Sequence, residues 1–209
     1  MELSFTIILI VLTCLVSYYG WKNPPFIDRS LFTPYLVHHK KEYSRFILSG
    51  FIHKDGTHLL FNMFTFYFFG NIVERYFAYV FGGITGIAVF LGFYLAAIIV
   101  SDIPTYLKEK HNPNYHALGA SGGTAATVFA SIILTPLSNI CIFGIFCLPG
   151  FVLGLLFLGY AFYKGKLSND HINHDAHFYG ALFGIVIILV ISPENALHFW
   201  NDIKGYSPF

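Results

Sequence analysis

The stretch that decides the fold is Gly119-Ala120-Ser121-Gly122-Gly123-Thr124-Ala125-Ala126, which opens an apolar run that continues to Leu134. In lipid no hydrophobic force draws helices together, so small residues mark a helix against which others pack closely. A serine flanked by glycines at the start of such a helix has an uncrowded hydroxyl and free backbone N–H groups beside it. A nucleophile with an oxyanion site needs both features. We interpret this stretch as the centre of an intramembrane active site.

The composition is that of a polytopic membrane protein. Of the 209 residues, 56% are hydrophobic and 11% are charged, whereas a soluble domain usually carries about 25% charged residues. The formal net charge of +1 gives no reason to expect nucleic acid as a partner. The length fits one compact domain over residues 1–209, with no linker or convincing internal repeat. The cysteines lie in apolar runs without metal-type spacing, and we interpret them as small packing residues: Cys14, Cys141 and Cys147.

The hydrophobic pattern predicts an all-α bundle of six transmembrane helices with a short fourth helix. The first run begins after Glu2 and has neither a basic n-region nor a cleavage site, so we count it as a span and not as a signal peptide. The fifth is interrupted by Pro149-Gly150, which should weaken or kink it. Residues 20–56 form a long loop that is apolar enough to lie in the membrane interface. The predicted spans are 3–19, 57–76, 79–101, 119–136, 139–163 and 176–191.

Span parity brings the polar leading ends of three helices to one face of the membrane. The second, fourth and sixth spans begin on the same side, and they carry His58 and Asn62, Ser121, and His177. The fourth span is also shorter than the fifth by about 10 Å at ~1.5 Å per residue. We therefore expect Ser121 to start below the surface, in a recess that water fills, because polar groups at membrane depth need such a cavity.

A base for Ser121 is available in His177. A serine becomes a nucleophile when a neighbouring base takes its proton. Gly180 and Gly184 follow His177 along the sixth span and would let this helix approach the glycine-rich fourth one closely. The alternative from composition alone is that Ser121 only packs against other helices and that His177 only lies at the interface.

His58 and Asn62 lie four residues apart, on one face of the second span. Both can donate a hydrogen bond from a side-chain nitrogen, which a developing oxyanion needs beside the backbone N–H of Ser121. Their alternative role is hydrogen bonding between helices of the bundle. Asp175 stands two residues before His177 and would point away along a helix, so we predict that it is an N-cap and not the third member of a triad.

A metal centre is the other reading of the histidines. His171, His174 and His177 lie three residues apart, a spacing that a helical set of ligands allows. However, Asn173 and Asp175 indicate a loop in the first part, and no His-Glu-x-x-His motif is present. No aspartate pair lies inside a span, so an aspartyl mechanism is poorly supported as well. We expect neither a metal site nor a cofactor.

Three motifs together resemble those of the rhomboid family of intramembrane serine proteases. The first is Arg45…His53-x-x-x-x-His58-Leu-Leu-Phe-Asn62, which continues to Gly70-x-x-x-Glu74. The second is Gly119-Ala120-Ser121-Gly122, which matches a Gly-x-Ser-Gly nucleophile motif. The third is His177-Phe-Tyr-Gly180-Ala-Leu-Phe-Gly184, which is similar to the family's histidine helix. One such motif would mean little, but all three lie in the expected order over residues 43–184.

The resemblance implies a serine endopeptidase with a six-helix core. Ser121 would be the nucleophile and His177 the general base of a dyad without an acidic third member. His58, Asn62 and the backbone N–H of Ser121 would hold the oxyanion, with Gly119 and Gly122 beside them. The substrate partner would be the membrane span of a single-pass protein that enters laterally from the lipid bilayer, with the fifth span acting as a gate. A rhomboid-like pseudoprotease that binds such helices without cutting them is the alternative, and a small transporter is a third class.

The sequence departs from the family pattern in places. An aromatic residue often follows the serine by four positions, where this chain has Ala125, and Tyr160 is a candidate to replace it. Ser44-Arg45 stands where a Trp-Arg pair is common. The resemblance implies a bacterial inner membrane protein whose site faces outward, whereas the positive-inside rule predicts a cytoplasmic site. Only Arg75 and Lys204 lie opposite the active-site side, which carries Lys22, Arg29, Lys40, Lys41, Arg45, Lys54, Lys108, Lys110, Lys164 and Lys166.

Overall fold

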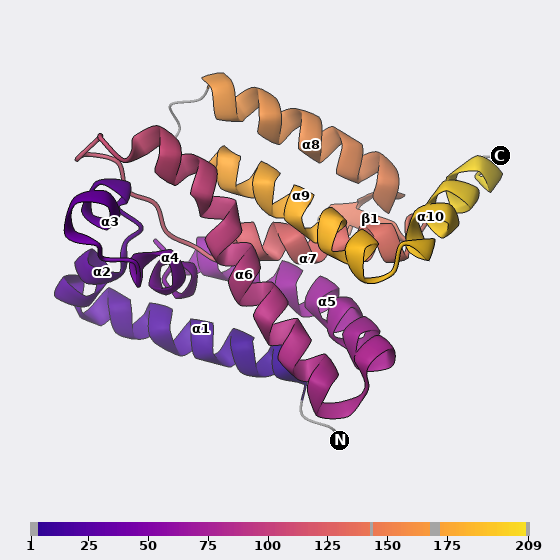
Figure 1. Ribbon diagram of the computed structural model, residues 1–209, viewed down its shortest axis with the longest axis horizontal. Coiled ribbons are helices and arrows are strands. Elements are labelled where there is room, and N and C mark those ends of the chain that lie inside the picture. Colours follow the sequence, from indigo (N-terminus) through magenta and orange to yellow (C-terminus); the bar gives the residue numbers. More distant parts are fainter. Residues whose placement is uncertain (1–3, 143, 168–171, 208–209) are drawn as a thin grey trace.

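The computed structural model describes residues 4–142, 144–167 and 172–207 and is mostly helical (Figure 1). The helices are α1 (Phe5–Lys22), α2 (Pro24–Ser30), α3 (Pro34–Lys40), α4 (Arg45–Leu48), the 3₁₀ turn η1 (Ser49–Phe51), α5 (Gly56–Phe81), α6 (Gly83–Glu109), α7 (Ser121–Leu134), α8 (Gly150–Leu167), α9 (His174–Ile191) and α10 (Glu194–Gly205). Two strands, β1 (Asn139–Ile142) and β2 (Phe146–Pro149), form an antiparallel hairpin.

Helix α7 is the centre of the bundle, because α5, α6, α8 and α9 all pack against it. Almost every residue from Gly122 to Ile133 is buried. The small residues Gly123 and Ala126 lie among the aromatic and aliphatic side chains of the core, such as Tyr94. The short apolar run of small residues thus forms the inner helix that its composition predicts.

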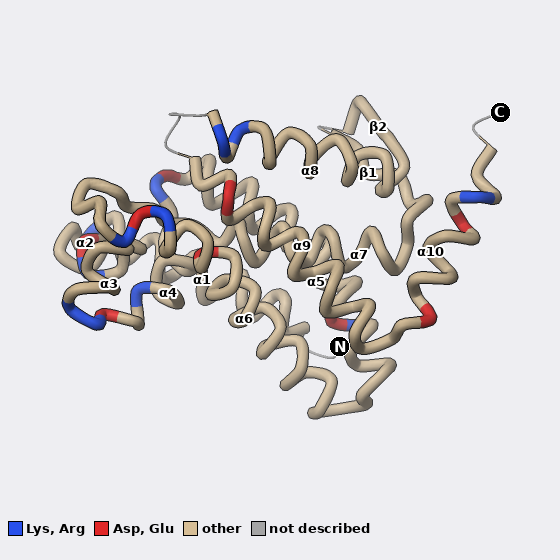
Figure 2. The backbone as a smooth tube through the Cα atoms, turned by 45° about the horizontal axis from the view of Figure 1, so that its top comes forward, with Lys and Arg blue, Asp and Glu red and all other residues tan. Residues whose placement is uncertain are grey.

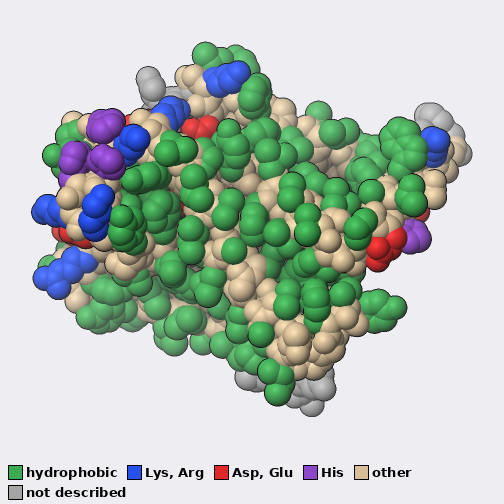
Figure 3. Space-filling model, viewed as in Figure 1, with side chains coloured by type: hydrophobic (Ala, Val, Ile, Leu, Met, Phe, Trp, Pro, Cys, Tyr) green, Lys and Arg blue, Asp and Glu red, His purple; other side chains and the backbone are tan. Residues whose placement is uncertain are grey.

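The outer surface suits a lipid environment. Among the described residues, three helices are long and apolar enough to cross a membrane, namely α1, α6 and α9, whereas α7 is a shorter apolar helix. Hydrophobic side chains cover the middle of the face shown in Figure 3. Most Lys and Arg residues gather around α2, α3, α4 and the neighbouring helix ends (Figure 2). The charge distribution expected from the sequence is therefore present in three dimensions.

The predicted fifth span, 139–163, is wrong in its first part. Residues 139–149 form the β-hairpin, and the helix begins only at Gly150 and continues to Leu167. Gly144, at the turn, has a φ of 70°, which glycine adopts without strain. The backbone N–H groups of Gly150 and Phe151 donate hydrogen bonds to the carbonyls of Ser138 and Pro136, in the turn that follows α7. The start of α8 is therefore fixed to the end of α7.

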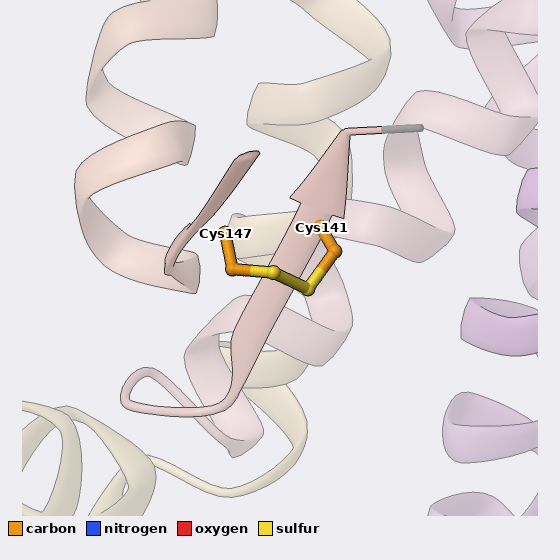
Figure 4. Close-up of a disulfide and its surroundings, with 2 residues drawn as sticks. All are labelled: Cys141 and Cys147. Carbon is orange, nitrogen blue, oxygen red and sulfur yellow. A yellow bond between two sulfur atoms is a disulfide. The ribbon is translucent and has the colours of Figure 1, made fainter. Parts of the chain in front are cut away.

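Two of the three cysteines form a disulfide, which corrects their interpretation as packing residues. Cys141 and Cys147 lie directly opposite each other in the hairpin register and are bonded (Figure 4). Cys14 is free and half-buried in α1. The apolar sequence around the pair concealed it, because hydropathy does not distinguish a strand from a helix in a short apolar run.

Polar contacts fasten α1 to α5. The carboxylate of Glu74 accepts hydrogen bonds from the hydroxyls of Thr6 (2.6 Å) and Ser4 (2.8 Å) and from the backbone N–H groups of Phe5 (2.8 Å) and Thr6 (2.9 Å). These N–H groups belong to the first turn of α1, where no partner exists within the helix. One turn earlier on α5, a Cβ at Gly70 would lie 2.9 Å from the Thr6 methyl group. The Gly70-x-x-x-Glu74 motif thus docks the start of α1.

The segment between α1 and α5 is folded around Arg45. Its guanidinium donates hydrogen bonds of 2.8 Å to the carbonyls of Asp28 and Leu31 and pairs with Glu42 at 2.6 Å. Arg45 is only 6% exposed, so a single buried cation joins α4 to the end of α2. The segment is therefore a set of short helices and not an irregular loop.

Candidate active site

The turn before Ser121 is held in place by backbone contacts. Gly119 has a φ of 119°, which side-chain-bearing residues rarely adopt, and its N–H donates to the carbonyl of Ser49 at 2.9 Å. Two residues earlier, Ala117 exchanges two backbone hydrogen bonds of 2.9 Å with Phe32. Ser121 then begins α7, where the first N–H groups of the helix have no carbonyl partner within it. N–H groups without a helical carbonyl partner therefore lie in the same turn as a half-buried hydroxyl.

The side chain of His53 binds this turn through a hydrogen bond. Its Nε2 accepts a hydrogen bond from the N–H of Ala120 at 3.3 Å, and its Nδ1 lies 3.0 Å from the hydroxyl of Ser17. The Ser17 hydroxyl donates to the carbonyl of Phe51 at 3.0 Å, so Nδ1 must carry the proton and donate to Ser17. Burial, with a smaller contribution from His58, lowers the pKa of His53 to about 3. A neutral imidazole therefore links α1 to the turn before Ser121.

Helix α9 approaches α7 at backbone distance. A Cβ at Gly180 would run into the carbonyl oxygen of Gly122, and one at Gly184 into that of Ala126. The residue numbers of the contacting pairs increase in the same direction along both helices. The two helices are therefore parallel and begin at the same end of the molecule. His177 lies three residues before Gly180, on the same face of α9. The predicted glycine-mediated approach of the two helices is thus present, and it brings the starts of α7 and α9 together.

The start of α9 differs from the prediction at one residue. The N-cap is Asn173, whose side-chain oxygen accepts from the N–H of Ala176 at 3.1 Å. Asp175 lies in the first turn and pairs with Lys108 at 3.4 Å, so the expected capping role is wrong for Asp175. Its charge still suits the first turn, where the helix dipole favours an anion. Asn173 was overlooked because both residues are good caps and the sequence does not fix where the helix begins.

Ser121 and His177 are both half-buried, and no hydrogen bond joins them among the residues that the structure describes. Catalytic hydrogen bonds are often long before a substrate binds. The rings of Phe157 and His174 lie 6.3 and 5.9 Å from the His177 ring. Tyr160, the sequence candidate for the missing aromatic at Ala125, contacts His174 at 5.7 Å. The aromatic neighbour of His177 is therefore Phe157 of α8, which the sequence did not single out.

The two predicted oxyanion donors lie on α5, and one of them covers the turn before Ser121. Atoms Cε1 and Nε2 of His58 lie 2.7 and 2.9 Å from the position of a Cβ on Gly119, so the ring covers that glycine. Asn62 is buried, and its Nδ2 donates to the carbonyl of His58 at 3.0 Å. A side-chain amide has two hydrogens, so one remains for another acceptor. His58 thus contacts the predicted Gly119, and Asn62 follows one turn deeper.

A small polar cavity adjoins Ser121 and Gly122. It encloses about 20 Å³, and its lining includes Ser101, Asp102 and Asn173. A cavity of this size and polarity is large enough for about one water molecule. Asn173 donates to Asp102 at 3.1 Å and accepts from Thr105 at 2.8 Å. These α6 residues carried no recognisable motif, and only the packing of α6 against α9 shows that they belong to the site.

The alternative metal centre has limited support in the structure. His171 lies outside the described residues. The His174 and His177 rings meet edge to face, with a centroid separation of 5.9 Å and an interplanar angle of 84°. Ser121 thus borders the small cavity, whereas the ring of His177 lies beside those of Phe157 and His174.

The fold and the site define a helical membrane protein with a serine and a histidine at the starts of two contacting helices. A family model described as the rhomboid domain matches residues 40–194. The match covers more than half of the chain, which therefore belongs to the rhomboid family, and with its apolar helices it is an integral membrane protein. The RHOMBOID-like protein 12, mitochondrial, of Arabidopsis thaliana is 28% identical over 144 residues. This match covers 65% of the chain and 42% of that relative.

Proposed function

We propose that the protein is an intramembrane serine endopeptidase with a dyad of Ser121 and His177. The observation that carries the proposal is the parallel glycine contact between α7 and α9, which brings the hydroxyl and the imidazole to one end of the same helix pair. Free N–H groups at the start of α7 and the cavity beside Ser121 supply the two other requirements, oxyanion donors and space for water. We propose one domain with six spans, of which α7 is the inner one.

In the proposed reaction the Ser121 oxygen attacks the carbonyl carbon of a peptide bond while His177 accepts the hydroxyl proton. The Ser121 N–H, His58 and Asn62 would stabilise the negative charge on the former carbonyl oxygen. His177 then gives the proton to the leaving amine, which leaves an acyl ester on Ser121. A water molecule attacks this ester while His177 takes one of its protons. His177 then gives this proton to the departing Ser121 oxygen, and the product leaves with a new carboxyl terminus.

The proposed substrates are membrane spans of single-pass proteins. A peptide bond inside a helix is not accessible to Ser121, so the span must unwind locally, which helix-breaking residues make easier. Helix α8 would be the gate for lateral entry from the bilayer. Its contacts with α7 include a Cβ position on Gly154 that lies 3.2 Å from side chains of α7, and several large side chains on α8 are exposed. Side-chain contacts of this kind separate at lower cost than backbone contacts.

For orientation, the family resemblance supports an inner membrane protein whose site faces outward. The charge distribution and the disulfide favour the opposite orientation, because disulfides persist in oxidising compartments and the hairpin lies at the far end from Ser121. Fusion of a fluorescent protein or of alkaline phosphatase after Phe209 would test this. Because α10 lies at the hairpin end, an outward site predicts a fluorescent fusion and an inactive phosphatase. The reverse result would overturn the proposed orientation.

Covalent labelling with a fluorophosphonate probe tests the proposed chemistry. Wild type should be labelled, whereas Ser121→Ala and His177→Ala should lose labelling by at least 100-fold, because an unactivated hydroxyl reacts slowly. Ser138→Ala and His198→Ala change exposed residues at the other end and serve as matched controls. Labelling that persists in Ser121→Ala would mean that another residue is the nucleophile.

The alternative is a pseudoprotease that binds membrane helices without cutting them. Two observations favour it: Ser121 and His177 are not hydrogen-bonded among the described residues, and Ala125 replaces an aromatic residue. Folded wild-type protein that resists the probe, and that also fails to cut a panel of membrane-span substrates, would support this alternative.

A further inference from the structure

A second group of histidines lies on the segment between α1 and α5 and on the loop after α6. His38 and His39 belong to the last turn of α3, and His111 follows the end of α6. One ring nitrogen from each can be chosen so that all three lie within 4.8 Å of one another. Figure 3 shows histidine side chains gathered at the end of the molecule that α3 occupies. His38 is half-buried and the other two are exposed, so this group is open to ions from solution.

The arrangement of the rings is one that a metal ion can use. The ring centroids of His38 and His39 are 4.8 Å apart, those of His38 and His111 are 5.2 Å apart, and those of His39 and His111 are 6.2 Å apart. The Tyr106 hydroxyl lies 3.2 Å from Nδ1 of His38. Histidine ligands usually direct their other nitrogen to such an oxygen, which fixes the ring and leaves Nε2 for the metal.

We propose that His38, His39 and His111 form a site for a divalent transition metal ion, with Zn²⁺ as the first candidate and water as the fourth ligand. Imidazole nitrogen is a preferred ligand of Zn²⁺, and three histidines with an open fourth position are an established set for this ion. At Zn–N distances of about 2.0–2.1 Å the nitrogens must come within about 3.3 Å of one another. Exposed His39 and His111 can close this gap by rotating about their side-chain bonds.

Nearby charges limit the affinity of the site. Lys41 and Lys110 are close enough to act on His38 electrostatically, and their positive charge opposes the binding of a cation. Coordination by the three imidazoles must therefore supply the binding energy. For this reason we expect binding to weaken at least tenfold when any one ligand is removed, because two imidazoles beside two lysines make a poor site.

Metal binding would join α3 to the loop between α6 and Ser121. Helix α3 begins two residues after Phe32, which pairs with Ala117, and His111 precedes Ala117 on the same loop. The metal would be a second connection between these segments, about two turns of α3 away from the first. It would hold the loop that leads to Gly119 and Ser121, so we expect Zn²⁺ to raise the unfolding temperature of the protein.

Zinc titration of the full chain in detergent, with any affinity tag removed, tests the proposal. Isothermal calorimetry should show one Zn²⁺ per wild-type chain, and His39→Ala and His111→Ala should each bind at least tenfold more weakly. His116→Ala removes an exposed histidine of the same loop and is the matched control, which should bind as wild type does. Only wild type and His116→Ala should gain thermal stability on addition of Zn²⁺.

Two results would overturn the proposal. The first is the absence of stoichiometric Zn²⁺ binding by the wild-type chain. The second is binding that His39→Ala and His111→Ala weaken no more than His116→Ala does, which would place the ion elsewhere, such as at the histidines near Ser121. All variants should keep the wild-type unfolding temperature without metal, which separates loss of a ligand from loss of the fold. Labelling of Ser121 is not part of the readout, so the result is independent of the proposed protease activity.

Discussion

Helices α8 and α9 both pack against α7, but they do so through different atoms. On α9, glycines place the backbone against the carbonyl oxygens of Gly122 and Ala126. On α8, Gly154 faces the side chains of Phe129 and Ile132. The side chains on the outward face of α8 are exposed. Backbone atoms cannot rotate aside, whereas side chains can change rotamer. The helix that carries His177 is thus held at backbone contact with α7, whereas α8, the proposed gate, contacts α7 through side chains.

The largest effect should come from adding one methyl group to the α7–α9 contact. Gly180→Ala should destabilise the protein by about 3 kcal/mol and abolish probe labelling, because its Cβ would overlap the carbonyl of Gly122. Gly159→Ala on α8 is the matched control, since a Cβ there meets nothing within 4 Å. That variant should be neutral or more stable by up to about 1 kcal/mol, because alanine favours a helix. Equal unfolding temperatures for the two variants would remove the distinction between the helices.

A second prediction concerns α1, which is held against α5 by the hydrogen bonds of Glu74 as well as by the close contact at Gly70. Glu74→Ala should destabilise the protein by about 2–3 kcal/mol, because it leaves the N–H groups of Phe5 and Thr6 and the hydroxyls around them without their acceptor. Glu194→Ala, at the exposed start of α10, should change stability by less than about 0.5 kcal/mol. Chemical unfolding in mixed micelles gives both values. A Glu74 variant as stable as the Glu194 variant would show that α1 is held by apolar packing.

A third prediction uses the lowered pKa of His53, which links α1 to the turn before Ser121. Its folded pKa of about 3 lies below the value of about 6.5 in an unfolded chain, so the folded state binds fewer protons. Its contribution is therefore complete above pH 6.5 and is lost as the pH falls towards 3. Between pH 7.5 and 5 the unfolding free energy should fall by about 2 kcal/mol from this residue.

The control for this prediction is a pair of glutamine variants. His53→Gln should be less stable than wild type at pH 7.5 but should lose less stability on acidification, because glutamine does not titrate. His116→Gln alters an exposed histidine and should keep the wild-type slope. A slope that is unchanged in His53→Gln would mean that other groups cause the acid sensitivity.

The packing of α9 against α7 could be predicted from the sequence, whereas the orientation of α8 could not. Glycines allow two helix backbones to come into contact, so Gly180 and Gly184 predicted the packing of α9 against α7, which the structure confirms. The approach of the His177 side chain to Ser121 stays a prediction. The position of Phe157 depends on the rotation of α8 about its own axis. That helix is apolar on nearly all sides, and such a pattern carries no information about which face turns inward.

The hairpin and the cap were missed for a related reason. Residues 139–149 are apolar enough for a membrane helix, but their pairing depends on a contact between Cys141 and Cys147 that hydropathy does not report. Likewise, Asn173 and Asp175 are equivalent as caps in isolation. The contacts of Asn173 with Thr105 and Asp102 on α6 decide between them. The contact between α7 and α9 was thus predictable, because glycine spacing marks it in the sequence. The hairpin and the cap were not predictable, because they depend on pairing with segments that the local sequence does not identify.

The smallest effect is expected at Phe157 of α8, the helix that contacts α7 through side chains. Phe157→Ala should cost about 1 kcal/mol or less in stability, because the side chain is only half-buried and α8 can adjust. It should nevertheless slow labelling of Ser121 by about 2- to 10-fold, the value of one aromatic contact, since its ring lies beside that of His177. Tyr160→Ala is the control, because Tyr160 contacts His174 and not the proposed base. If both variants slow labelling equally, α8 acts through its position as a whole, and the single ring contact with His177 has no separate role.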